Sequence, residues 1–491
     1  MTSSNTVQSV AKSSLWLTIS YGFSKALQLI SQIFLARILT PEMFGVWGMV
    51  MVITTLAELF KDSAIAQVLV QRGLDNKPLA DAVYSLGITI SVIMFVAQSL
   101  LGYPLAQFFN EPIVWPLTAI TALIFLVGAG AGSHGAVLSR RMQFRELAIA
   151  DSGAGLARMG GAVVCASMGF GVWSFAIAEV ARAIVDAGLK RWFSRYPFRY
   201  YLRPDPEAVR NVRSYISSLV GINLAVYANT NGDNLIVGRL LGAQALGFYS
   251  MAYQLAMLPA FALSQINRVN LAVISQRDTI GQQRYVCKML ELCALLSAPI
   301  YGVGFVIAPW LIPRLYGSEW TAVVPLFQVI LIFAYSRGFM SILGTTLNAL
   351  NKPQINAAIN WVLVPAAVPA FLIGARWLGI MGVAIAAAGV MGIGASIWFW
   401  LATSRVMACP FLLLAKPVIL PTGSAAVALW GATLLPDNSP YKLALQPAVL
   451  LLIYGFVLSV GSAGRIPQML ISLVRQLFKT EPPEAKPLNP R

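Results

Sequence analysis

Apolar stretches of about 20 residues recur along the whole chain and alternate with short polar joints. One such stretch crosses the hydrocarbon core of a bilayer as a helix, because a spanning segment must satisfy its own backbone hydrogen bonds. The pattern predicts an all-α, polytopic membrane protein of about 14 transmembrane helices, although twelve or thirteen would also fit. The predicted spans are residues 13–36, 44–70, 80–104, 113–138, 147–168, 171–193, 211–237, 245–270, 286–310, 321–348, 355–375, 379–403, 411–435 and 443–464.

The joint after the first predicted span occurs again after the seventh. "LARILTPEMFGVWGMV" (residues 35–50) matches "VGRLLGAQALGFYSMA" (residues 237–252), since in both an Arg is followed by a short turn, a Gly and another apolar run. Three later pairs follow in the same order: "FFNEPIVWP" with "LYGSEWTAVVP", "RRMQFRELA" with "NKPQINAAI", and "GFGVWSFAIAE" with "WLGIMGVAIAA". We interpret the Arg–turn–Gly joint as structural, with the Arg as an interfacial anchor and the Gly for the turn.

Six predicted spans, an even number, separate corresponding joints, so both halves have the same orientation in the membrane. We therefore expect two six-helix lobes related by a pseudo-two-fold axis along the membrane normal, plus two extra C-terminal helices. The segments are a cytoplasmic N-terminal segment (1–12), the N-lobe with spans 1–6 (13–193), a basic cytoplasmic connector (194–210), the C-lobe with spans 7–12 (211–404), an appendage with spans 13 and 14 (405–464), and a cytoplasmic amphipathic helix with a disordered tail (465–491).

Composition agrees with a lipid environment and charge gives the orientation. The 491 residues are 57% hydrophobic and 11% charged, with a mean hydropathy of +0.71, whereas soluble proteins carry about 25% charged residues. The net charge of +16 does not indicate a nucleic-acid partner, because most of the 35 Lys and Arg fall on joints of one side. By the positive-inside rule that side, which includes the connector, is cytoplasmic, and both termini are then cytoplasmic.

The sequence resembles a known transporter family at several of these joints. "ARILTPEMFGVWGMVMVITTLAELF", "AQVLVQR", "RMQFRELA", "GFGVWSFAIAE" and "VGRLLGAQALGFYSMAYQLAMLP" are similar to the polysaccharide transporter (Wzx-type oligosaccharide flippase) family of the multidrug/oligosaccharidyl-lipid/polysaccharide flippase superfamily. The resemblance covers about residues 10 to 400. It implies two six-helix lobes plus two helices in the bacterial inner membrane, and an undecaprenyl-diphosphate-linked oligosaccharide as substrate, flipped outward for exopolysaccharide, capsule or O-antigen assembly. A polysaccharide polymerase and chain-length or export proteins are the partners that it suggests.

Five cations inside predicted spans are the candidate substrate-binding residues. A charge near the bilayer centre costs roughly 2.5–3.5 kcal/mol, so these side chains should face a cavity or a charged partner. An embedded diphosphate needs such cations, because Arg grips phosphate oxygens with paired donors and Lys acts as a point charge. The positions that match Arg158 and Arg182 in the second half fall near Val368 and Val390, so the positive charge is mainly in the first half. The five candidates are Lys25, Lys61, Arg158, Arg182 and Arg337.

Structural roles stay open for several of these residues. Lys61 has Glu58 and Asp62 within one turn and fits a local ion pair, and Arg182 lies between Glu179 and Asp186 on one helix face. Arg158 has only Asp151 on its own helix, and Arg337 is the one mid-span cation of the second half. For sugar rings, the stacking candidates are Tyr227, Tyr253, Trp47 and Trp173.

Ion coupling is left open, and no cofactor is predicted. Asp233 is the candidate for binding a coupling Na⁺ or H⁺, with a bundle-stabilising hydrogen bond as the alternative. The single histidine, His134, lies beside Ser133 and fits a packing hydrogen bond better than a proton switch. The four cysteines show neither metal spacing nor a disulfide pattern.

Two other functions compete with the flippase. A cation-coupled multidrug antiporter of the same superfamily should expose acidic residues in its cavity, whereas the isolated mid-span charges here are mostly cationic. A membrane glycosyltransferase or polymer ligase, a less favoured alternative, needs a substantial loop with acidic or His residues for acid–base chemistry, and the external joints are short. The sequence contains no Gly-rich phosphate loop ending in GK[ST], so we expect a transporter and not an ATPase or other enzyme.

Overall fold

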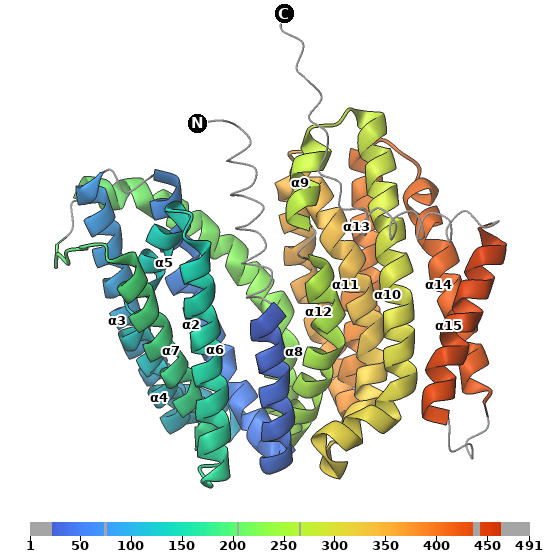
Figure 1. Cartoon of the computed structure of the whole chain (residues 1–491), viewed down its shortest axis with the longest axis horizontal. Coiled ribbons are helices and arrows are strands. Elements are labelled where there is room, and N and C mark those ends of the chain that lie inside the picture. The colour runs from blue at the N-terminus through green and yellow to red at the C-terminus, as the bar shows by residue number, and fades with distance from the viewer. Residues whose placement is uncertain (1–21, 73–75, 204–205, 265–266, 436–441, 463–491) are drawn as a thin grey trace, which may run out of the picture. The chain divides into compact units, whose positions relative to one another are not determined.

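A computed structural model describes residues 22–72, 76–203, 206–264, 267–435 and 442–462, and within these ranges all regular structure is helical. This confirms the all-α prediction; the predicted N-terminal segment and the C-terminal amphipathic helix lie outside the described residues (Figure 1). The elements are a helix over residues 22–38, α2 (Pro41–Arg72), α3 (Lys77–Phe109), α4 (Val114–Val127), α5 (Ala131–Arg140), α6 (Phe144–Ser167), α7 (Trp173–Ser194), α8 (Pro206–Ser264), α9 (Asn267–Ser275), α10 (Thr279–Tyr316), the 3₁₀ turn η1 (Ser318–Trp320), α11 (Val323–Ala349), α12 (Pro353–Ala386), the π-helical η2 (Ala387–Gly394), α13 (Ala395–Val406), α14 (Phe411–Thr433) and α15 (Lys442–Gly461).

Each of the fourteen predicted spans is mostly helical over its described residues, although the span predicted at 113–138 is divided into α4 and α5. By length and hydropathy alone, seven described helices can cross a membrane, and α4 with α5 forms an eighth, bent by 43°. Both α8 and the run from Pro353 to Val406 continue through a break at a glycine. The helices α6 and α7 fall outside this set, and they carry most of the charged residues that line the cavity described below.

The backbone repeats where the sequence repeats. The helix over 22–38 ends before residue 40 and α2 begins at once, and the matching position in α8 is Gly242, where a φ of 86° breaks the helix. Gly171 and its match Gly379 have φ values of 55° and 58°, and the turn residues Asn110 and Gly317 also share positive φ. Positive φ favours Gly and is tolerated by Asn, so a residue suited to positive φ stands at the same place in both copies.

The two copies of the joint pack against each other. A Cβ added at Gly45 would overlap the backbone carbonyl of Ala243, and one added at Gly247 would overlap the carbonyl of Pro41. In the repeat, Pro41 corresponds to Ala243 and Gly45 to Gly247. The glycine of each joint therefore lies against the equivalent carbonyl of the other joint. Such reciprocity is the mark of a two-fold interface, and only glycine allows backbones to come this close.

Both arginines of the joints contact the turn that follows a later span of the other half. Arg37 donates from Nε to the carbonyl of Leu315 at 2.9 Å and from a terminal nitrogen to the carbonyl of Arg314, at the C-terminal end of α10. Arg239 lies over the ring of Phe108, 5.6 Å from its centroid, at the end of α3. Phe108 and Leu315 begin the matching stretches of the sequence, so this contact is also reciprocal. The two arginines, predicted as anchors at the membrane interface, therefore also connect the two halves of the chain.

Trp320 fills the space beside this joint. Its side chain is fully buried, its Nε1 donates to the carbonyl of Ala36 at 2.9 Å, and its ring meets Phe44 edge-on with centroids 5.0 Å apart. Ala36 lies in the last turn of its helix, where carbonyls lack helical partners. The joint is thus a packed and hydrogen-bonded closure at one end of the helices.

The segment after α7 is held against the N-terminal helices. The backbone N–H groups of Arg199 and Tyr201 donate to Asp81 Oδ1 at 3.0 Å and to Ser85 Oγ at 2.9 Å, both on α3. The buried His134 lies with its Nδ1 2.6 Å from Ser194 Oγ, which confirms the predicted packing hydrogen bond. The segment 195–203 is therefore hydrogen-bonded to α3 through its backbone.

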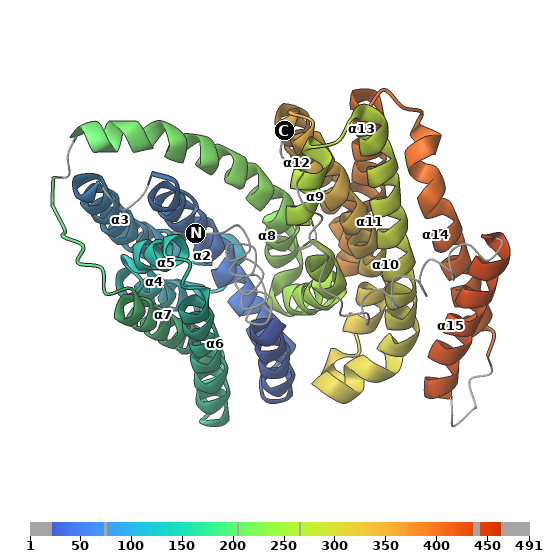
Figure 2. The ribbon, with the colours of Figure 1, turned by 45° about the horizontal axis from the view of Figure 1, so that its top comes forward.

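The chain divides into two compact units. The first comprises Met1–Ala256, Leu311–Phe333 and Gln354–Ala395, and the second comprises Met257–Trp310, Ala334–Pro353 and Ser396–Arg491. In the first unit α6 lies along α7 and α3 along α4 (Figure 1). In the second, α14 lies along α15 (Figure 2), and Tyr454 of α15 donates to the carbonyl of Leu295 on α10 at 3.1 Å.

Candidate functional site

The first unit contains a cavity of about 760 Å³ whose wall combines apolar side chains with a group of charged and polar ones. Five elements line it: the helix over 22–38, α2, α6, α7 and α8. Three of the predicted cations, Lys25, Arg158 and Arg182, belong to its lining. They come from three different helices, so the fold brings together charges that are far apart in the sequence.

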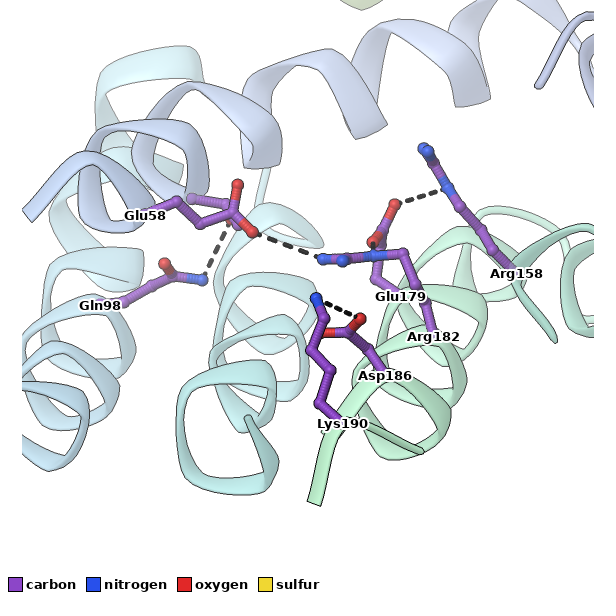
Figure 3. Close-up of polar contacts among 8 residues, drawn as sticks. Glu58, Gln98, Arg158, Glu179, Arg182, Asp186 and Lys190 are labelled. Carbon is purple, nitrogen blue, oxygen red and sulfur yellow. Dashed lines mark hydrogen bonds and ion pairs between the residues drawn. The ribbon is translucent and has the colours of Figure 1, made fainter. Parts of the chain in front are cut away.

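Two of these cations share one buried carboxylate. Glu179 on α7 accepts from Arg158 Nε at Oε1 (2.7 Å) and from Arg182 Nε at Oε2 (2.6 Å), and its side chain is 7% exposed. Arg182 also contacts Glu58 Oε1 on α2 at 3.5 Å, so the pairs form a continuous chain from α6 across α7 to α2 (Figure 3). Arg182 and Glu179 are three residues apart on one helix, whereas Arg158 reaches Glu179 because α6 packs along α7.

A second ion-pair group lies on the same wall. Lys190 Nζ is 2.7 Å from Asp186 Oδ1, one turn earlier on α7, and 3.2 Å from Asp151 Oδ1 on α6. Lys190 falls at the end of the sixth predicted span (171–193) and was not among the five candidate cations, although the Asp four residues earlier was a signal for it. The helix face suggested that Asp186 would pair with Arg182, but its ion pair is with Lys190.

The cavity is therefore close to electrically balanced. Its lining contains the cations Lys25, Arg158, Arg182 and Lys190 and the carboxylates Asp151, Glu179 and Asp186. Lys25 donates to Gln28 Oε1 at 3.1 Å on its own helix. Buried charges are stable only when they are paired and hydrogen-bonded, so the carboxylates explain how several cations persist at this depth. The lining alone carries one more cation than carboxylates, and Glu58, which pairs with Arg182 from outside the lining, offsets that charge.

The other predicted site residues lie elsewhere or stay predictions. Lys61 is in α2, but its side chain and the predicted pairing with Glu58 and Asp62 lie outside the described part of the chain. Arg337 lies in the section of α11 that belongs to the second unit, so its position opposite the arginines stays a prediction.

Asp233 is buried in α8 and is not in the cavity lining. Its carboxylate accepts from the hydroxyl of Tyr249 at 2.8 Å and from the backbone N–H of Asn234 at 2.8 Å. These contacts match the bundle-stabilising alternative, and its role in ion coupling stays a prediction. Among the described residues, no three His, Cys, Asp or Glu side chains are grouped to hold a metal ion.

Uncharged groups complete the wall. Asn231, Asn234, Ser250 and Gln254, all of α8, belong to the cavity lining. Of the four aromatic candidates only Trp47 is in the lining, and its ring stacks on Phe175 at 5.4 Å. The amide and hydroxyl groups are suited to sugar hydroxyls, and the ion pairs to a charged group.

The apolar helices and this charge-lined cavity define a multi-pass membrane protein whose fold is shared by flippases and multidrug transporters. The structure is similar to "Lipid II flippase MurJ, inward closed conformation", with a TM-score of 0.76 and 15% identity over 92% of this chain and 99% of that one. It is also similar to an inward-facing multidrug resistance MATE family transporter of the MOP superfamily, with a TM-score of 0.58 and 16% identity over 78% and 96% of the two chains.

The chain belongs to the polysaccharide biosynthesis protein family, whose sequence profile matches residues 34–325. It is 25% identical over 378 residues to the lipopolysaccharide biosynthesis protein WzxC of Escherichia coli (strain K12), covering 75% of this chain and 76% of WzxC. It is 24% identical over 368 residues to the succinoglycan biosynthesis transport protein ExoT of Rhizobium meliloti (strain 1021), covering 74% and 73%. The teichuronic acid biosynthesis protein TuaB of Bacillus subtilis (strain 168) is 22% identical over 357 residues, or 70% and 72% of the two chains.

Proposed function

We propose that this protein is a flippase that moves undecaprenyl-diphosphate-linked oligosaccharide units outward across the bacterial inner membrane by alternating access, for assembly of a surface polysaccharide. The observation that carries the proposal is the arginine pair held inside a polar cavity between transmembrane helices. An arginine pair suits a diphosphate, because guanidinium and phosphate form paired charge-assisted hydrogen bonds. The relatives named for lipopolysaccharide, succinoglycan and teichuronic acid biosynthesis support a glycan as cargo.

The size and lining of the cavity support a substrate whose polar head lies in the cavity and whose lipid chain stays outside it. About 760 Å³ is the volume of a site for a drug-sized ligand. Such a space fits the diphosphate and adjoining sugars, while the polyprenyl chain would stay in the surrounding lipid. The α8 amides, Asn231 and Asn234, would then meet sugar hydroxyls opposite the charged wall.

The wider setting of this function is also a proposal. The inner membrane, cytoplasmic termini, and contacts with a polymerase and chain-length or export proteins fit the place of such a substrate in glycan assembly. Energy would come from an H⁺ or Na⁺ gradient or from substrate flux. Asp233 is our candidate for the coupling site.

The multidrug antiporter is the second candidate, favoured by the MATE-like fold and by carboxylates in the cavity. An antiporter needs a carboxylate that can exchange a drug cation for H⁺ or Na⁺. Here Asp151, Glu179 and Asp186 each already contact a lysine or arginine of the chain. We therefore retain the flippase.

Complementation of a deletion strain tests the proposal. Mass analysis of that strain should show accumulated lipid-linked oligosaccharide, and the wild-type gene should remove it. Arg158→Ala and Arg182→Ala should abolish or strongly reduce export at normal membrane levels. Lys at either position should restore it only in part, because the paired donors do not return. Normal export by Arg158→Ala, Arg182→Ala and Lys25→Gln would refute the site.

A further inference from the structure

We propose that Glu179 is a positioning residue that presents Arg158 and Arg182 as a preorganised pair to the diphosphate, an inference that rests on the proposed function. Each carboxylate oxygen holds one arginine, and both hold it at Nε, at 2.7 Å for Arg158 and 2.6 Å for Arg182. A single buried group thus fixes two guanidinium planes that come from two helices.

The choice of Nε leaves the useful donors available. A guanidinium has five N–H donors, one on Nε and four on the two terminal nitrogens. In Figure 3 the terminal nitrogens of Arg158 point away from Glu179, and its side chain is 40% exposed in the cavity wall. Arg182 uses one terminal nitrogen toward Glu58, at the long distance of 3.5 Å. Most terminal donors of the pair therefore remain for phosphate oxygens.

The arrangement also solves an electrostatic problem. Two guanidinium groups in a site of low dielectric repel each other and would turn apart without a shared anion. Glu179 lies between them and leaves the trio with one net positive charge. Its own side chain is 7% exposed, so bulk water cannot substitute for it. An empty site of this kind keeps the geometry in which it meets the ligand.

Two explanations of Glu179 predict opposite signs for one substitution. Glu179→Gln removes a negative charge from the cavity, so if Glu179 only neutralised the arginines, an anion should bind more tightly. Gln keeps one acceptor oxygen but turns an NH₂ group toward the second arginine, which releases it. If Glu179 positions the pair, the diphosphate should bind more weakly despite the gain in positive charge.

The experiment measures binding of farnesyl diphosphate and farnesyl monophosphate to the purified full-length protein in nanodiscs by isothermal calorimetry. We expect Glu179→Gln to weaken farnesyl diphosphate about tenfold, the effect of one charge-assisted hydrogen bond, and to reduce the preference over the monophosphate. Glu179→Asp, which keeps both acceptor oxygens, should recover part of that preference. Asp81→Asn removes another buried carboxylate, remote from the cavity lining, and should leave both affinities unchanged.

The possible failures are distinguishable. Equal or tighter binding of farnesyl diphosphate by Glu179→Gln would overturn the positioning role while leaving the proposed function intact. Wild-type protein that binds no farnesyl diphosphate, together with a deletion strain that accumulates no lipid-linked oligosaccharide, would overturn the proposed function itself. If Glu179→Gln does not fold, the preference ratio measured on Glu179→Asp decides: a ratio equal to that of the wild type counts against positioning.

Discussion

One methyl group at the repeated joint should force apart two helices that now touch through their backbones. A Cβ on Gly45 would stand 3.0 Å from Ala243 Cα, and one on Gly247 would stand 2.8 Å from the Pro41 carbonyl carbon, whereas ordinary contact begins at 3.4 Å. The obstacle in each case is backbone, so no side chain can rotate away. Overpacking costs about 1–3 kcal/mol, and we expect Gly45→Ala and Gly247→Ala each to lower the free energy of unfolding by about 2–3 kcal/mol.

The assay is SDS titration of the purified protein in mixed micelles, followed by tryptophan fluorescence. Gly160→Ala and Gly188→Ala are matched controls, because both glycines are helical and a Cβ on either meets nothing within 4 Å. These controls should be neutral or slightly stabilising, since Ala is the better helix former.

The double variant tests the reciprocity directly. The Gly247 Cβ would also lie 3.2 Å from the backbone nitrogen of Gly45, so both methyl groups enter one interface. Once the first has separated the helices, the second should cost less, and the combined loss should be smaller than the sum. Stabilities of Gly45→Ala and Gly247→Ala that match those of the controls would refute the close packing, and strict additivity would refute the shared interface.

Three further predictions use other parts of the molecule. With the four native cysteines replaced, single cysteines near Arg141 and Tyr200 should resist an external thiol reagent and those near Asn110 and Gly317 should react; labelling near Tyr200 from outside would overturn the topology. Trp320→Phe should cost about 1 kcal/mol of unfolding free energy for the lost hydrogen bond, and Trp320→Ala about 3–5 kcal/mol, so equal costs in the SDS titration would contradict its packing role. Proteoliposomes should transport without ATP, because the sequence has no GK[ST] phosphate loop, and an ATP requirement without any partner protein would contradict this.

The helices were predictable because lipid imposes one simple rule on the sequence. Every spanning stretch must be long and apolar, and the described helices follow the predicted spans closely. The repeated joints were also visible, since glycine and turn residues mark backbone geometry directly, as the matching φ values of Gly171 and Gly379 show. The reciprocal contact between the joints could not be predicted, because sequence similarity does not tell which matching segments touch.

Three of the five candidate cations could be placed at a cavity from the sequence, but their pairing could not. Lys25, Arg158 and Arg182, chosen for their depth in the predicted spans, line the cavity, and their role in substrate binding stays a prediction. Helical spacing relates residues only along one helix, so it indicated Asp151 as the partner of Arg158. The actual partner is Glu179, which the packing of α6 on α7 brings into contact. For the same reason the positive excess was overestimated, since the partner carboxylates lie on neighbouring helices.

The reciprocal joint bears on how this chain could evolve. A half-length ancestor would have paired with a second copy of itself through the same two-fold surface. Fusion of two such copies would free other positions to differ, and the two halves do differ: the first carries the arginines and the matching positions near Val368 and Val390 are neutral. At Gly45 and Gly247 that freedom is absent, because each glycine is constrained by the other copy's backbone. The two-fold symmetry is thus kept at the contact between the two joints and is lost in the residues that line the cavity.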